Sequence, residues 1–220
     1  MLTFARDGAE RFPLAAMDVL EDIKAIASGL APDRAGIRLH GFAELAALLA
    51  PGAAIGGVAA GVMGRAARPV RAILFDKTAT ANWSLGWHQD RTIVVAERRD
   101  VDGYGPWTIK AGLLHVAPPI HLLARMVTLR VHLDAVAGDN APLLIAPGSH
   151  RAGRVAEEDI DSVVGACGIA TCLAERGDIW LYATPILHAS EAAVRPRRRR
   201  VLQVDYAAED LPGGLEWLGV

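Results

Sequence analysis

The first third of the chain has the spacing of apolar residues that is typical of helices. Between Leu14 and Leu30 the apolar side chains recur every three or four residues, which places them on one helical face. The ranges 41–49 and 53–65 predict two further short helices, and Pro69 ends this pattern. We therefore expect residues 1–69 to form a helical layer.

Beyond residue 69 the pattern changes to short apolar segments separated by turn residues. Apolar and polar positions alternate most clearly in 126–134 (MVTLRVHLD), as expected for a strand. Further strands are expected at 70–77, within 86–95, and at 143–146, 168–173, 178–183, 186–190 and 200–207. Short helices are expected at 119–125 and 157–164. Because regular helices do not separate the strands, the order of elements favours an α+β fold or a mostly-β barrel over a parallel doubly wound sheet.

The bulk properties of the chain narrow the class of protein. Its 220 residues suit one domain, with the barrel expected at residues 70–207. The formal net charge of −2 gives no general attraction to nucleic acid or to acidic membranes. The apolar range 43–63 is interrupted by a Pro-Gly pair, and each half is shorter than the about 20 residues that span a bilayer. We expect no membrane or nucleic-acid partner, and the sequence does not indicate an oligomeric state.

The two cysteines and the N-terminus bear on location. Cys167 and Cys172 are five residues apart, so on a strand they would point to opposite faces, and we expect no disulfide between them. Residues 1–12 contain charges and no long apolar core, so we expect no signal peptide. Both features favour a reducing, cytoplasmic location.

The segment with the clearest potential for chemistry is Trp87-His88-Gln89-Asp90. On an extended chain, positions two apart share a face, so the imidazole of His88 and the carboxylate of Asp90 can reach one metal ion. His188 lies in another strand-like segment and offers a second imidazole. Two histidines and one carboxylate form the facial triad of non-haem Fe(II) oxygenases, which leaves metal positions open.

A second pair with the same spacing competes for this role. His132 and Asp134 lie in the alternating strand 126–134, where a hydrogen-bonded core histidine and an acidic residue at a strand end are the simplest interpretation. The sequence distance from this pair to His188 is also feasible. Spacing alone therefore leaves both pairs open as metal ligands.

The sequences that flank these residues resemble the phytanoyl-CoA dioxygenase family. The resemblance covers residues 70–207 and is carried, in order, by NWSLGWHQDRT, GPW, NAPLLIAPGSH, GDIWLYATPILHAS and RRRRVLQVDYA. It implies a double-stranded β-helix, or jelly-roll barrel, with the His-x-Asp motif on an early strand and the distal histidine on a late one. This order favours His88 and Asp90 over His132. Ala141 stands where relatives usually have glycine, a small change away from the metal ligands.

The resemblance also implies Fe(II), 2-oxoglutarate and O2 as cofactor and co-substrates. Arg199 aligns with the arginine that binds the far carboxylate of 2-oxoglutarate, and a guanidinium offers a planar fork for a carboxylate. Ser190 matches a serine that assists it, and Arg130 aligns near the co-substrate. Lys77 and Asn82 are expected to line the pocket or to stabilise turns.

Strand alternation divides the run of arginines between two faces. Arg198 and Arg200 share a face with Leu202, Val204 and Tyr206, which we expect to pack away from the pocket. Arg199 lies on the opposite face. The run is therefore not expected to form a nucleic-acid patch.

The expected activity is hydroxylation of a small organic or lipid-like molecule, with release of succinate and CO2. Asp90 favours hydroxylation because related halogenases have a small residue at the corresponding position. The irregular range 97–119, with Trp107, Lys110 and His115, is expected to cover the barrel mouth, and His115 is interpreted as a surface or hydrogen-bonded residue. The alternatives are a cupin-type metal enzyme without 2-oxoglutarate and a non-catalytic ligand-binding barrel.

Overall fold

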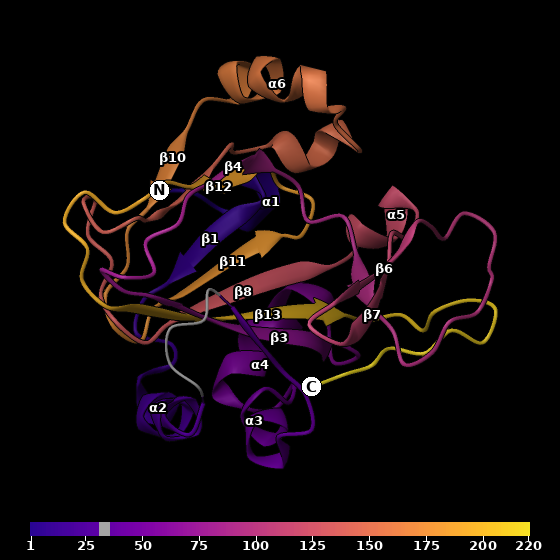
Figure 1. The fold of residues 1–220 in the computed structure, drawn as a ribbon, viewed down its shortest axis with the longest axis horizontal. Helices are drawn as coiled ribbons and strands as arrows, with labels where there is room; N and C mark the ends of the chain where they lie inside the picture. The colour runs from indigo at the N-terminus through magenta and orange to yellow at the C-terminus, as the bar shows by residue number, and fades with distance from the viewer. Residues whose placement is uncertain (31–35) are drawn as a thin grey trace.

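The computed structural model describes residues 1–30 and 36–220. Its centre is a six-stranded sheet in the order β1-β11-β8-β13-β3-β2, with antiparallel neighbours throughout. These strands are β1 Ala9–Phe12, β2 Ile37–Leu39, β3 Arg68–Lys77, β8 Val127–His132, β11 Ile179–Ala183 and β13 Arg199–Ala207. Figure 1 shows this sheet across the middle of the molecule.

A four-stranded sheet lies on one side of the six-stranded sheet and has the order β10-β9-β12-β4 (Figure 1). Its strands are β4 Leu85–His88, β9 Leu143–Ile145, β10 Ala170–Cys172 and β12 His188–Ser190. A third sheet, β5-β7-β6, contains β5 Ile93–Val94, β6 Trp107–Lys110 and β7 Leu113–Val116. The fold is thus a jelly roll whose sheets remain separate and do not close into one continuous barrel.

Three helices cover the opposite face of the six-stranded sheet, and the last helix packs against β4 of the four-stranded sheet. The helices are α1 Phe4–Asp7, α2 Leu20–Ser28, α3 Ala43–Leu48, α4 Ala54–Met63, α5 Ile120–Leu123 and α6 Ile160–Cys167, with 3-10 turns at Met17–Val19, Ser149–Ala152 and Glu157–Asp159. Figure 1 shows α2, α3 and α4 together on that face. None of the helices in the described ranges is long and apolar enough to cross a membrane.

The main hydrophobic core lies between this helical layer and the six-stranded sheet. Leu202, Val204 and Tyr206 point from β13 into it and are fully buried, as strand alternation predicted. The hydroxyl of Tyr206 donates to the carbonyl of Leu49 at 3.0 Å, which satisfies its polar end inside the core. The other face of the same sheet carries polar residues, among them Arg71, Arg130 and Gln203, together with apolar residues such as Ile73 and Phe75.

Three features differ from the expectations drawn from the sequence. The short edge strands β1 and β2 were not predicted, since three or four residues give too little alternation to detect. The helix expected over 14–30 is confined to Leu20–Ser28, preceded by a 3-10 turn. The range 97–119 contains the β6–β7 hairpin, whose Ala111-Gly112 turn has two positive φ angles (50° and 79°). By contrast, Cys167 and Cys172 are free thiols, as the sequence predicted.

Candidate active site

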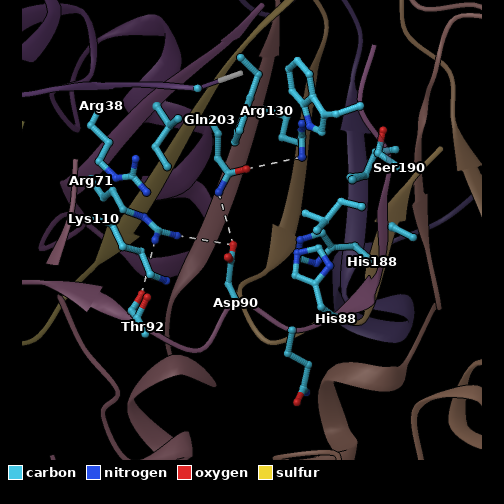
Figure 2. A pocket seen from close by; sticks show the side chains of 18 of the residues that line it. Arg38, Arg71, His88, Asp90, Thr92, Lys110, Arg130, His188, Ser190 and Gln203 are labelled. Atoms are coloured by element: carbon cyan, nitrogen blue, oxygen red, sulfur yellow. Dashed lines mark hydrogen bonds and ion pairs between the residues drawn. The ribbon is translucent and has the colours of Figure 1, made fainter. Parts of the chain in front are cut away.

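The structure brings together the three residues that we expected to bind a metal ion. His88 ends β4 and His188 begins β12, and the two are directly opposite each other in the antiparallel register. Asp90 follows β4 by two residues. One possible ligand atom from each side chain lies within 4.8 Å of the others, and the two imidazole rings are 4.3 Å apart (Figure 2).

Both imidazoles are oriented by main-chain carbonyl groups. Nδ1 of His88 is 2.7 Å from the carbonyl oxygen of Gly86, and Nδ1 of His188 is 2.9 Å from that of Ile186. A carbonyl can only accept, so each Nδ1 carries a proton and each Nε2 keeps a lone pair for a metal. Burial, followed by the proximity of His88, lowers the pKa of His188 to about 4 and keeps it in the neutral form that binds metals.

The carboxylate of Asp90 is held by side chains from two strands of the large sheet. Nη2 of Arg71 lies 3.5 Å from it, and Nε2 of Gln203 donates to it at 3.4 Å. Arg71 is itself anchored because its Nε donates to the buried Asp205. Burial acts to raise the pKa of Asp90, but the charge of Arg71 and the two imidazoles outweigh it, so this pKa is lower than usual.

The competing pair, His132 and Asp134, is arranged differently. His132 is 2% exposed, and neither of its ring nitrogens has a hydrogen-bond partner among the described residues. Both carboxylate oxygens of Asp134 accept from Arg200, at 2.7 and 2.9 Å. Among the described residues, the group that could hold a metal contains His88, Asp90 and His188 and neither member of this pair.

A cavity of about 530 Å³ adjoins the three candidate ligands and carries buried positive charge on one side. Lys77, Arg130 and Arg199 line it and are 3%, 6% and 2% exposed. None of the three forms a salt bridge with any described acidic residue, and Nε of both arginines lacks a hydrogen-bond partner. Burial, and then the charge of Arg130, lowers the pKa of Arg199. Such a cluster is suited to binding an anion.

The ammonium group of Lys77 is already directed by neighbouring oxygens. Its Nζ donates to the carbonyls of Trp83 and Glu191, at 2.7 and 3.0 Å, and to the hydroxyl of Ser190 at 3.1 Å. Ser190 also lines the cavity. Burial, with the charges of Arg199 and Arg130, lowers the pKa of Lys77 to about 8.

Asn82 has a different position from the other expected pocket residues. It is not among the described residues that line the cavity. Its amide nitrogen donates to the carbonyl of Ala193 at 3.0 Å, and its amide oxygen accepts from the same residue's N–H at 2.7 Å. This pair of bonds ties the loop before β4 to the segment after β12, so Asn82 has a structural role.

The remaining members of the arginine run are paired with carboxylates outside the pocket. Arg199 is buried, whereas the guanidinium groups on either side of it lie at the surface or partly exposed. The pairs are Arg197 with Asp139 at 2.7 Å, Arg198 with Asp76 at 2.9 Å and Arg200 with Asp134 at 2.7 Å. The opposite orientation of Arg199 agrees with the strand alternation.

Sequence reasoning missed the residues that support the candidate ligands. Arg71 and Lys77 are an even number of residues apart on β3, so they share a face, and both side chains line the cavity. Gln203 and Asp205 lie on the Arg199 face of β13 by the same alternation. Extending the alternation along both strands from the pocket residues would have identified all three.

Comparisons with known proteins agree with this architecture. The sequence profile described as phytanoyl-CoA dioxygenase (PhyH) matches residues 53–201. The chain therefore belongs to the phytanoyl-CoA dioxygenase family. No match was found among curated proteins.

Several solved structures share the fold. EctD from S. alaskensis, in its apoform, is 20% identical, with a TM-score of 0.66 over 99% of this chain and 78% of its own. HygX from Streptomyces hygroscopicus, with nickel, 2-oxoglutarate and hygromycin B bound, is 16% identical, with a TM-score of 0.61 over 93% of this chain and 84% of its own. The epimerase SnoN, in complex with Fe3+, alpha ketoglutarate and nogalamycin RO, is 16% identical, with a TM-score of 0.65 over 96% of this chain and 88% of its own. Together with the family match, they confirm the expected jelly-roll fold.

Proposed function

We propose that this chain is a non-haem Fe(II)- and 2-oxoglutarate-dependent oxygenase that hydroxylates a small organic molecule. The observation that carries the proposal is one cavity with two complementary parts. A cluster of two imidazoles and one carboxylate lies on its wall, and beside it lie three buried cations that have no acidic partner among the described residues. The first part fits Fe(II), and the second fits a dicarboxylate.

The metal would be held by His88, Asp90 and His188. The donor set fits, because two neutral imidazoles and one ionised carboxylate are the ligands of the facial triad. The carbonyl groups that orient the rings and the Arg71 guanidinium that holds the carboxylate supply the supporting contacts such a site needs. When bound, Fe(II) would supply the activation of O2 that couples oxidative decarboxylation of 2-oxoglutarate to oxidation of a second substrate.

The far carboxylate of 2-oxoglutarate would be held by Arg199, with Lys77 and Ser190 beside it. The guanidinium offers two parallel donors, and a carboxylate there would neutralise the mutual repulsion of the buried cations. Arg130 lies at the same wall, where its Nη1 is 3.5 Å from Oε1 of Gln203. This arrangement would fix one end of the co-substrate.

Hydroxylation is the reaction outcome that Asp90 favours, because the carboxylate occupies the position that related halogenases leave to halide. HygX and SnoN bind hygromycin B and nogalamycin RO, and we infer that this chain likewise acts on a small molecule. SnoN is described as an epimerase, so this fold also supports another outcome. Product analysis by mass spectrometry separates the two, since hydroxylation adds one oxygen atom and epimerisation leaves the mass unchanged.

Succinate formation tests the proposal directly. Purified protein incubated with Fe(II), 2-oxoglutarate and O2 should release succinate slowly even without the second substrate, and His188→Ala should abolish this release. The Fe(II) protein should also develop a visible charge-transfer absorption when 2-oxoglutarate is added under anaerobic conditions. Absence of both signals in a correctly folded, metal-loaded protein would favour the cupin-type enzyme or the ligand-binding barrel.

A further inference from the structure

A second cluster of positive charge lies in the same cavity, on the side of Asp90 away from the two histidines. Figure 2 shows Arg38, Arg71 and Lys110 gathered there. They come from β2, β3 and β6, three strands that belong to two different sheets. All three line the cavity that also contains the candidate metal ligands.

Two of these charges, on the half-buried Arg38 and the exposed Lys110, have no counter-ion within residues 1–30 and 36–220. Arg71 is paired with Asp205 and Asp90, whereas neither Arg38 nor Lys110 forms a salt bridge with any described acidic residue. Nε of Arg38 is buried and has no hydrogen-bond partner in the described part of the chain. Burial, and then the charge of Arg71, lowers the pKa of Arg38. An anion that contacts Arg38 would offset the repulsion between its half-buried guanidinium group and that of Arg71.

His115 adds an unpaired polar atom to the same region. It is 0% exposed and not a surface residue, and its Nδ1 is 2.9 Å from the carbonyl oxygen of Leu113. Its Nε2 has no partner among the residues that the structure describes, and the residue lines the cavity. Burial lowers the pKa of His115, and the charges of Arg71, Arg38 and Lys110 lower it further against the opposing effect of the Leu113 carbonyl. His115 thus adds a buried polar atom to the cavity that the three cations line.

The described residues that line the cavity carry more positive than negative charge. Seven of the lining residues are arginine or lysine and one is a carboxylate, although the complete chain has a net charge of −2. Fe(II) and doubly ionised 2-oxoglutarate carry opposite charges of equal size, so their binding leaves the excess unchanged. Asp205 and Glu157 pair with Arg71 and Arg91 from outside the lining, and a further anion would reduce the positive charge that remains.

We propose that the second substrate is a small molecule with a carboxylate or phosphate group, and that Arg38 and Lys110, assisted by His115, bind this group. The assignment rests on the proposed function, because it places the reacting carbon between this cluster and the candidate metal ligands. Arg38 supplies a planar fork and Lys110 a flexible point charge, a combination that accepts either type of oxyanion. A cavity of about 530 Å³, shared with 2-oxoglutarate, limits the substrate to a small molecule.

The proposal is tested with probes that differ only in charge. Hexanoate, hexyl phosphate and the neutral hexanol are titrated calorimetrically into the anaerobic Fe(II)–2-oxoglutarate protein. The variant R38Q/K110Q removes the proposed ligands, and R65Q/R176Q removes two exposed arginines that form no salt bridge among the described residues and do not line the cavity. Binding of 2-oxoglutarate is measured in each protein as the reference.

We expect at least one anionic probe to bind the wild type and R65Q/R176Q about tenfold or more tightly than R38Q/K110Q, the loss that corresponds to a charge-assisted hydrogen bond. Hexanol should bind all three proteins equally. The preference between carboxylate and phosphate then identifies the anion. Equal affinities for anionic probes and hexanol, or for the wild type and R38Q/K110Q, would overturn the proposal. If 2-oxoglutarate itself failed to bind the wild type, the proposed function would fail instead.

Discussion

Arg71 lies with its Nη2 atom 3.5 Å from the carboxylate of Asp90, on a strand of the opposite sheet. The same guanidinium is anchored by Asp205 on β13, and Thr128 donates to that carboxylate at 3.0 Å. A candidate metal ligand in the loop after β4 is therefore positioned by a charge fixed in the large sheet. Such supporting contacts decide how precisely a ligand is held.

Replacing Arg71 with glutamine should weaken Fe(II) binding by about 10–100-fold, because the carboxylate of Asp90 loses its charged support. The same change leaves Asp205 buried without its partner, which should reduce the free energy of unfolding by about 3–5 kcal/mol. Anaerobic metal titration and chemical denaturation measure the two effects. Arg38→Gln is the control, since it removes a nearby guanidinium that does not contact either carboxylate, and it should retain metal affinity. Unchanged affinity in Arg71→Gln would refute this role.

The choice between the two His-x-Asp pairs is tested by replacing one histidine of each. His88→Ala should lose Fe(II) binding, whereas His132→Leu should retain it. The leucine should also leave stability equal or higher, because the ring of His132 is buried and both nitrogens lack a partner within residues 1–30 and 36–220. Equilibrium dialysis against Fe(II) and thermal unfolding give both results. Loss of iron from His132→Leu alone would show that the ligand assignment is wrong.

Two adjacent arginines provide a matched test of the co-substrate site. Arg199→Ala should lower the affinity for 2-oxoglutarate by about 10–100-fold while the metal remains bound, because the carboxylate loses a charge-assisted pair of bonds. Arg198→Ala removes the same charge from a surface pair with Asp76 and should have no effect. Titration of the charge-transfer absorption measures both affinities. Equal affinities in the two variants would exclude Arg199 from this role.

The lowered pKa of Lys77 predicts that the affinity for 2-oxoglutarate depends on pH. Its pKa is lowered from the usual 10.5 to about 8, so it carries a charge below pH 8 and loses it above. Affinity for 2-oxoglutarate should fall above pH 8, by no more than about tenfold per pH unit since one proton is involved. The Lys77→Gln variant should bind more weakly at pH 7 and lack this dependence.

The contribution of Lys77 to the free energy of unfolding should rise with pH, whereas the affinity for 2-oxoglutarate should fall. The folded chain releases the Lys77 proton at about 8, whereas the unfolded chain keeps it until about 10.5. The unfolded state therefore binds more protons in this window, and the free energy of unfolding contributed by Lys77 rises with pH across it. Denaturation of wild type and Lys77→Gln at pH 7 and 9.5 isolates this contribution. A pH-independent difference between them would contradict the assigned pKa.

Strand alternation explains which parts of the site could be predicted. His88 and Asp90, and likewise Arg199 against its neighbours, were assigned because positions two apart on a strand share a face. The same rule applied further along β3 and β13 would have reached Arg71 and Asp205. What it does not provide is the distance between strands, so the choice between two His-x-Asp pairs depended on family resemblance.

Arg38 could not be predicted from the sequence because the strand that carries it is only three residues long. β2 pairs with β3 at the edge of the large sheet and has no pattern of its own. Long-range pairing, not local propensity, decides such strands. The β6–β7 hairpin was hidden for a related reason, since its turn has alanine where asparagine or aspartate usually marks positive φ.

The most direct test of the account is a crystal structure of the protein prepared anaerobically with Fe(II) and 2-oxoglutarate. We predict one metal ion bound to His88, Asp90 and His188, and a 2-oxoglutarate molecule whose far carboxylate contacts Arg199. Iron bound elsewhere, or those three side chains turned away from a common ion, would contradict the central claim.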